Sequence, residues 1–217
     1  PNLKDCVCKV CITDDVASFS SYVIQVNPRG GTISPVTENL ESWLYVIDGS
    51  ATLVVGDRTL NLVAGDFAFI PPATTYSLNN TSTASFTFIS LKKAYLPTGF
   101  GTPTFVYGNE KDRVAGPFPP AIAKNVTAKT LIGGPAYDGL FLLANISVGG
   151  GLIVTENHPE EHAILWISGD GAYLLGDQWY ALKAGDYIWV DSFAPRSFTN
   201  LGTTPCKALI WRINARV

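Results

Sequence analysis

The sequence contains no methionine and only two histidines among its 217 residues. Charged residues are also scarce, at 15% of the chain, whereas hydrophobic residues make up 47%. This composition supplies enough apolar side chains for a large core and excludes an intrinsically disordered chain. The net charge of −3 offers no basic surface to a nucleic acid, so we expect no nucleic-acid partner.

Two long hydrophobic patterns are missing as well. No apolar run approaches the roughly 20 residues of a membrane-spanning helix, so we expect no membrane partner. No stretch combines a sustained 3.6-residue period with helix caps, which predicts little helix beyond a short candidate at residues 121–128. Instead, stretches rich in β-branched and aromatic residues, such as 21–26, 43–47 and 67–70, alternate with glycine-containing turns. The sequence is therefore typical of an all-β protein.

An internal repeat divides the chain into two halves. Residues 49–70 align without gaps on residues 169–190. The residues that the two copies share are mostly turn formers: Gly49, Gly56, Asp57, Gly65 and Asp66, matching Gly169, Gly176, Asp177, Gly185 and Asp186. We predict two copies of one β-module, residues 1–110 and residues 111–217. The segment 96–120 is rich in glycine and proline and is expected to link them.

Cysteines and glycosylation sequons bear on the cellular compartment. An even number of cysteines permits two disulfides without fixing their pairing: Cys6, Cys8, Cys11 and Cys206. A C-x-C-x-x-C zinc knuckle is the alternative, although it lacks a convincing fourth ligand. N-x-[ST] sequons begin at four positions: Asn79, Asn80, Asn125 and Asn145. Together these features favour a glycoprotein of the secretory pathway, in the endoplasmic reticulum or outside the cell.

Both histidines lie in one short stretch together with a carboxylate. Glu156, His158 and His162 have the spacing E-x-H-x-x-x-H. Imidazole nitrogens and a carboxylate oxygen are good ligands for a divalent transition metal. In an extended segment Glu156 and His158 share a face, and Pro159 favours a break before the strand that would supply His162. The spacing predicts a three-ligand metal site with open positions; the alternative is two surface histidines in an acidic turn.

The repeated pattern resembles that of the cupin superfamily. The resemblance rests on glycines and ligand positions in two motifs: Gly150, Glu156, His158, His162 and Gly169, then Gly185, Arg196 and Asn200. The second motif's usual proline and glycine are replaced here by Asp191 and Phe193. Two such modules resemble a bicupin, in which each module is an antiparallel barrel or jelly roll. In the first module the ligand positions offer one carboxylate and no imidazole, so we expect no metal there: Val36, Glu38, Ser42 and Tyr76.

Among bicupins, nearly the whole chain resembles the (S)-ureidoglycine aminohydrolases of purine degradation. The similar segments are the E-x-H-x-x-x-H stretch and residues 169–180, 184–189 and 193–195. This resemblance implies an Mn²⁺ enzyme that hydrolyses ureidoglycine to ureidoglycolate and ammonia, with Fe²⁺ or Zn²⁺ as alternative metals. It implies that the glutamate and both histidines of the stretch bind the metal and that Tyr173 contacts the substrate. Tyr173 would equally suit a position in the core.

The chain departs from that family in its substrate pocket. Arg196 stands where the family has a metal-binding glutamine, and arginine has no lone pair to offer a metal. Ala208 replaces a substrate-contacting tyrosine, and Arg212 replaces a lysine. We therefore expect a rebuilt pocket in which Arg196 and Arg212 hold the carboxylate of a small-molecule substrate, while Glu156 moves a proton.

Three functions are consistent with these residues. The first is a metal-dependent hydrolase that releases ammonia from a small ureido or amino acid, with Glu156 and Arg196 as catalytic residues. The second is a bicupin isomerase, lyase, decarboxylase or dioxygenase acting on a carboxylate metabolite, which the altered positions favour. The third is a non-catalytic cupin for binding or storage. We also expect a homo-oligomer, and we expect Glu160 and Glu161 to be solvated acids on a turn.

Overall fold

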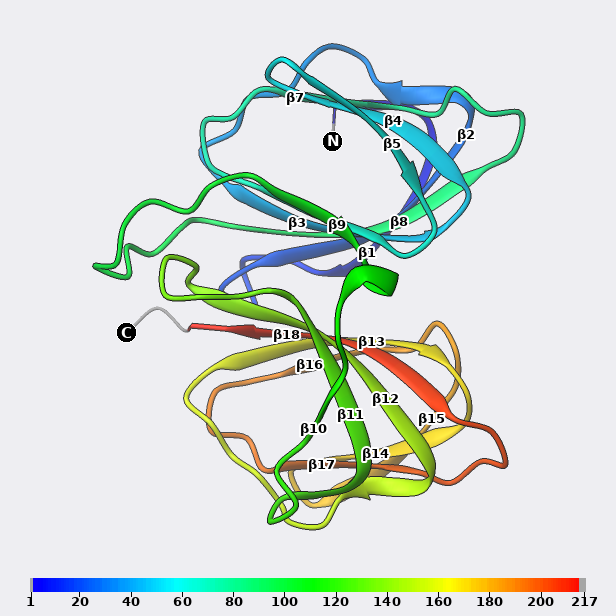
Figure 1. The fold of residues 1–217 in the computed structure, drawn as a ribbon, viewed down its shortest axis with the longest axis vertical. Coiled ribbons are helices and arrows are strands. Elements are labelled where there is room, and N and C mark those ends of the chain that lie inside the picture. The colour runs from blue at the N-terminus through cyan, green and yellow to red at the C-terminus, as the bar shows by residue number, and fades with distance from the viewer. Residues whose placement is uncertain (1, 215–217) are drawn as a thin grey trace. The chain divides into compact units, whose positions relative to one another are not determined.

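The computed structural model describes residues 2–214, and in that part of the chain it contains 18 β-strands and one short 3₁₀ helix. The predicted all-β class is confirmed. The strands belong to two compact units: one takes residues up to Pro97 together with 101–112, and the other takes 98–100 and the residues from Arg113 onward. In each unit the strands curl into a barrel (Figure 1). The described residues include no helix long and apolar enough to cross a membrane.

The first unit is built from one antiparallel sheet, which has nine strands in the described residues. The strand order is β5-β4-β7-β2-β8-β3-β6-β9, and β1 pairs with β2. Apolar side chains such as Leu53, Leu62 and Phe86 are fully buried and form its core. The 3₁₀ helix η1 (Glu110–Asp112) follows the last strand. The strands are β1 (Leu3–Ile12), β2 (Ser20–Thr32), β3 (Glu41–Asp48), β4 (Ser50–Val55), β5 (Arg58–Val63), β6 (Asp66–Ile70), β7 (Tyr76–Asn79), β8 (Phe86–Lys93) and β9 (Val106–Asn109).

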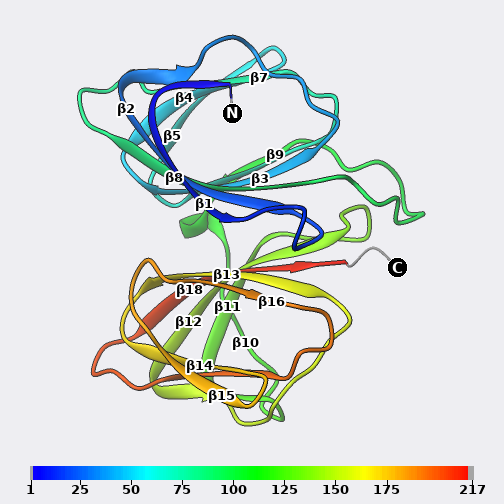
Figure 2. The ribbon, with the colours of Figure 1, turned by 180° about the vertical axis from the view of Figure 1, so that it is seen from behind.

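The second unit repeats this arrangement. Its strand order is β15-β14-β17-β12-β18-β13-β16, with β11 added to β12 and β10 added to β11. Within this unit β13, β16 and β18 lie in one layer, and β14 and β15 lie in the other (Figure 2), with β17 beside β14 (Figure 1). The strands are β10 (Gly116–Pro117), β11 (Ala123–Ile132), β12 (Gly139–Leu152), β13 (Glu161–Ser168), β14 (Gly171–Leu175), β15 (Gln178–Leu182), β16 (Tyr187–Val190), β17 (Arg196–Asn200) and β18 (Cys206–Ile213).

The internal duplication extends far beyond the segment that reveals it in the sequence. β3 and β13 begin at Glu41 and Glu161, and β8 and β18 begin at Phe86 and Cys206, so the same offset of 120 residues holds across both barrels. The two central strands also pair in the same register, because β3 pairs with β8 as β13 pairs with β18. Strands β1 to β8 therefore have structural equivalents in β11 to β18, whereas β9, η1 and β10 have none.

The segment between the modules contains more strand than expected. The short helix expected at residues 121–128 is wrong, because these residues enter β11, which pairs with β12 along its length. The β-branched Val126 and Thr127 suit a pleated strand, and Val126 is buried in the core. The segment 96–120, expected as a linker, also contributes β9, which pairs with β6, and β10, which pairs with β11.

The structure shows the pairing state of the cysteines and the exposure of the sequon asparagines. All four cysteines are free; Cys206 is buried, and the other three lie half-buried on β1. Among the described residues, no group of three or more His, Cys, Asp or Glu residues is arranged to hold a metal ion. Of the sequon asparagines, Asn125 is exposed, whereas Asn80 is only 1% exposed. Passage through the secretory pathway stays a prediction.

Asn80 tests how much buried side-chain hydrogen bonds contribute to the stability of the first barrel. Its Nδ2 donates to the carbonyls of Val26 and Ala84 at 2.9 and 2.8 Å, and its Oδ1 accepts from the Ser82 amide at 3.0 Å. We predict that Asn80→Ala lowers the free energy of unfolding by about 2–3 kcal/mol, because buried polar groups lose their partners. Urea denaturation measures the loss. The matched change Asn61→Ala, on the exposed face of β5, should cost under about 0.5 kcal/mol. Equal losses in the two variants would contradict this account.

Candidate active site in the second barrel

An extended segment before β13 carries Glu156 and His158. Two backbone hydrogen bonds of 2.9 Å join Glu156 to Arg196, and each residue donates one of them. The two side chains of such an antiparallel pair project from the same face of the sheet. The His158 carbonyl also accepts the Phe193 amide at 2.6 Å, and Phe193 has φ of 59°, a conformation that favours glycine. These backbone contacts fix the Cα positions from which the Glu156 and His158 side chains project.

His162 lies on β13 with its side chain in the barrel. It pairs in register with Arg212 of β18 on one side and with Val190 of β16 on the other, and it is 6% exposed. Burial, with the positive charges of Arg196 and Arg212 nearby, lowers the pKa of His162 to about 2. The ring is therefore neutral at physiological pH, and its buried Nε2 has no hydrogen-bond partner in the described residues.

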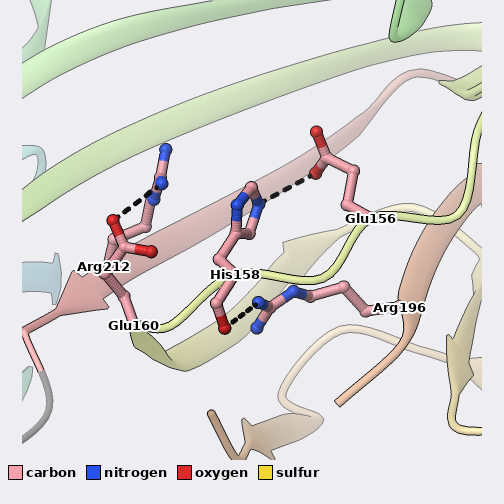
Figure 3. A network of polar contacts seen from close by, with 5 residues as sticks. All are labelled: Glu156, His158, Glu160, Arg196 and Arg212. Atoms are coloured by element: carbon pink, nitrogen blue, oxygen red, sulfur yellow. Dashed lines mark hydrogen bonds and ion pairs between the residues drawn. The ribbon is translucent and has the colours of Figure 1, made fainter. Parts of the chain in front are cut away.

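The three expected metal ligands lie close together but do not form a closed cluster. The Nε2 atom of His158 is 3.4 Å from Oε2 of Glu156 (Figure 3). The rings of His158 and His162 stack, with their centroids 5.4 Å apart and their planes at 22°. No three carboxylate, imidazole or thiol side chains of residues 2–214 are placed to hold one ion. One imidazole would have to turn before all three donors could meet.

Arg196, at the start of β17, is buried with most of its hydrogen-bonding capacity unused. It is 2% exposed, and its Nη2 donates to the His158 carbonyl at 3.3 Å (Figure 3). Its Nε and Nη1 groups are buried and have no hydrogen-bond partner among the described residues. Burial lowers the pKa of Arg196, although arginine stays charged at physiological pH. A guanidinium with two unpaired donors in a cavity is suited to bind an anion.

Arg212 differs from Arg196 because it already has a partner. Its Nη2 is 3.0 Å from Oε1 of Glu160, and both side chains are partly exposed (Figure 3). Glu160 is thus the counterion of a site residue. The expectation of two solvated acids is wrong for Glu161, which is 6% exposed and accepts the indole Nε1 of Trp189 at 3.0 Å.

One cavity of about 210 Å³ collects all six residues that the sequence singled out: Glu156, His158, His162, Tyr173, Arg196 and Arg212. Tyr173 is 3% exposed, belongs to the core cluster and also lines the cavity, and its contact with a substrate stays a prediction. Burial raises the pKa of Tyr173, which keeps its hydroxyl protonated. Ala208 is buried in the core and does not line the cavity.

Sequence reasoning missed the apolar part of the cavity wall. Phe118 and Pro119 line it from the segment expected to be a linker, and Ile122 and Phe198 add further apolar surface. Nothing in the motifs pointed to these residues, because an apolar wall has no characteristic spacing. They make the cavity small and largely apolar around a few polar groups, which is the usual form of a small-molecule site.

The donors present suit a divalent transition metal. Two imidazoles and one carboxylate are ligands that Mn²⁺, Fe²⁺ and Zn²⁺ all accept. The His162 ring is neutral and its buried Nε2 has no partner, and a metal ion bound to this nitrogen would explain both features. Arg196 cannot be a further ligand, since a guanidinium has no lone pair to offer.

Comparisons with known proteins agree with this architecture. The family described as the Cupin domain matches the chain twice, over residues 22–92 and 142–212. A solved structure, the protein Ylba from E. coli, has a TM-score of 0.85 and 22% identity, with all of this chain and 86% of that chain covered. At that identity the likeness concerns the fold alone. It confirms the expected pair of cupin barrels.

Two curated relatives carry the same name. An (S)-ureidoglycine aminohydrolase of Arabidopsis thaliana is 28% identical over 195 residues, covering 89% of this chain and 64% of the relative. The (S)-ureidoglycine aminohydrolase of Escherichia coli (strain K12) is 26% identical over 208 residues, covering 93% of this chain and 78% of the relative. The chain therefore spans less than two thirds of the length of the Arabidopsis relative. The expected resemblance to these enzymes is confirmed.

The burial of His162 predicts how stability depends on pH. A histidine whose pKa is near 6.5 when unfolded and about 2 when folded binds a proton preferentially in the unfolded state. Its contribution is therefore fully present above pH 6.5 and falls by about 1.4 kcal/mol per pH unit below it. We predict that metal-free protein loses about 2–3 kcal/mol more between pH 7 and pH 4.5 than the His162→Gln variant does, as measured by urea denaturation.

The same prediction can be read from the imidazole itself. With only two histidines, the His162→Gln variant assigns both rings in a nitrogen-15 NMR spectrum. The His162 signal should stay that of a neutral ring down to pH 4. A titration midpoint near pH 6 for this ring would contradict the burial argument.

Proposed function

Because this chain belongs to the cupin family, we propose that its second barrel is the active site of a metal-dependent hydrolase that releases ammonia from a small ureido or amino acid of the ureidoglycine type. Two relatives named (S)-ureidoglycine aminohydrolase support a hydrolase-like function. The observation that carries the proposal is the cavity, where two imidazoles, one carboxylate and a buried guanidinium with two unpaired N–H groups line a space for a small molecule.

Arg196 binds the carboxylate of the substrate in this proposal. Leaving a buried guanidinium with unpaired donors costs several kcal/mol, and a carboxylate removes that cost. The unpaired Nε and Nη1 groups lie on different edges of the guanidinium, and each can donate a charge-assisted hydrogen bond to an oxygen of a bound anion. Since Nη2 is occupied by the His158 carbonyl, the arginine cannot swing away freely.

The metal is held by Glu156, His158 and His162 in this proposal. Mn²⁺, or Fe²⁺ or Zn²⁺ in its place, supplies a Lewis acid that polarises the reacting carbon and its amine. A carboxylate in the position of Glu156 can serve as base towards water and as acid towards the departing ammonia. Tyr173, which stays protonated, donates a hydrogen bond from the apolar wall.

The charges in the site link the binding of the metal ion to the binding of the substrate carboxylate. Glu156 and Glu160 offset Arg196 and Arg212, while His162 is neutral, so these residues together carry no net charge. A divalent ion adds two positive charges beside Arg196 and is repelled by it unless an anion lies between them. A substrate carboxylate provides that anion. Metal and carboxylate should therefore bind each more tightly when the other is present.

A second candidate keeps the site but changes the reaction. Arg196, rather than a glutamine, stands at the family's fourth ligand position, which favours a different carboxylate substrate and an isomerase, lyase, decarboxylase or dioxygenase reaction. Ammonia release from (S)-ureidoglycine separates the two candidates, because only the hydrolase produces it. We further propose that the protein assembles as a homo-oligomer, which light scattering of the purified chain tests.

Replacing Arg196 should uncouple the carboxylate from the metal. We predict that Arg196→Gln weakens binding of a carboxylate inhibitor such as ureidoglycolate roughly 10- to 100-fold, because charge-assisted hydrogen bonds are lost. The same change should strengthen Mn²⁺ retention, since the cation is gone and an amide oxygen can coordinate. Isothermal titration calorimetry measures both affinities. The control Arg58→Gln, at an exposed arginine of the first barrel, should change neither. Metal lost with carboxylate affinity unchanged would show that Arg196 is structural.

Replacing both histidines tests the metal assignment. We predict that the double variant His158→Ala and His162→Ala binds no stoichiometric Mn²⁺ but keeps a folded second barrel, because neither ring supports a backbone hydrogen bond. Metal analysis after gel filtration and a circular dichroism spectrum give the two readouts. Asn157→Ala, an exposed residue between the ligands, serves as the control and should retain metal. Stoichiometric metal in the double variant would overturn the assignment.

A further inference from the structure

The first barrel contains a cavity of its own, with a volume of about 280 Å³. Its walls are mostly apolar, with Leu44, Leu53, Ile70 and Phe88 among the residues that line it. In the second barrel, Tyr173 occupies the position equivalent to Leu53. The cavity combines these apolar walls with several polar side chains, and it has the size and form of a small-molecule pocket.

One end of this cavity carries a neutral polar cluster. Lys92 of β8 makes an ion pair of 2.5 Å with Glu38, and its Nζ donates to the Tyr76 hydroxyl at 3.2 Å. Lys92 is equivalent to Arg212, Glu38 to His158, and Tyr76 to Arg196. The ammonium and the carboxylate cancel each other, so neither is left to attract a charged ligand. The Tyr76 hydroxyl and the one remaining proton of Lys92 can still donate to a neutral acceptor.

Two serine side chains also line this cavity. Ser42 and Ser90 are 4% and 5% exposed. In the second barrel the equivalent positions are His162 and Ile210. The first barrel therefore offers hydroxyl groups where the second offers a metal ligand and an apolar side chain.

From these observations we propose that the first barrel is a second, independent binding site for a small uncharged organic molecule with a largely apolar body and one hydroxyl or carbonyl group. The apolar body would fill the space between Leu44 and Phe88, and the polar group would bond to the Tyr76 hydroxyl. An anionic ligand would face Glu38 and a cationic ligand would face Lys92, so both are disfavoured. The site needs no metal.

Three probes with one ring system test the chemistry. We expect 2-naphthol, which is uncharged at pH 7, to bind the whole protein with a stoichiometry of one, followed by its fluorescence. Naphthalene, which lacks the hydroxyl, should bind roughly two- to tenfold more weakly, because one hydrogen bond is lost. 2-Naphthoate, tested on the Arg196→Gln variant so that the proposed carboxylate site of the second barrel does not contribute, should bind at least about tenfold more weakly, because it brings an unpaired charge into the cavity. Tighter binding of naphthoate, or no binding of naphthol, would overturn the proposal.

Two variants locate the probe. Tyr76→Phe should weaken 2-naphthol binding roughly two- to tenfold, whereas Tyr107→Phe, a second tyrosine of the same barrel outside the cavity, should leave it unchanged. Ser90→Ile places in the first barrel the residue that the second barrel has there, and it should abolish binding by filling the cavity. If Ser90→Ile does not fold, as judged by circular dichroism, the two tyrosine variants decide. Unchanged binding by Tyr76→Phe or by folded Ser90→Ile would place the probe elsewhere and overturn the proposal.

Discussion

The candidate site depends on one backbone interaction, the pair of hydrogen bonds between Glu156 and Arg196. This pair fastens the segment that carries His158 to β17, so the ligand-bearing segment and the arginine share one face of the sheet. The first barrel has the same pair between Val36 and Tyr76, with side chains of unrelated chemistry. The interaction is therefore a property of the fold, and the side chains placed on it decide what each barrel can bind.

A second backbone contact supports the same segment in both barrels. The His158 carbonyl accepts the Phe193 amide, and the Glu38 carbonyl accepts the Ala73 amide at 2.7 Å. Phe193 and Ala73 both adopt the left-handed backbone conformation, with φ of 59° and 58°. Phe193 stands where the cupin motif usually has glycine. The turn is therefore kept, but with a strained backbone conformation at Phe193. The departure from the motif changes the residue and preserves the geometry.

Much of this architecture could be predicted from the sequence, and the failures have physical causes. The repeat of glycines and aspartates predicted two copies of one β-module, because tight turns leave a strong signature in residue type, and the resemblance to cupins implied that each module is a barrel. The helix at 121–128 was wrong because the pairing of β11 with β12 decides its conformation, and that partner is distant in sequence. Glu161 was taken as solvated because nothing local reveals its bond to the Trp189 indole. The ion pair between Glu160 and Arg212 could not be predicted either, because it depends on how strands distant in the sequence pair with each other.

The duplication lets one scaffold carry two kinds of site, and the central claim is that only the second barrel holds a metal. The most direct measurement is a crystal structure of the protein grown with Mn²⁺, with anomalous scattering collected at the manganese edge. This account predicts one anomalous peak, bound by Glu156, His158 and His162, with the nitrogen atoms of Arg196 outside its coordination sphere. A peak beside Glu38 and Lys92 in the first barrel, or no peak at the two histidines, would contradict it.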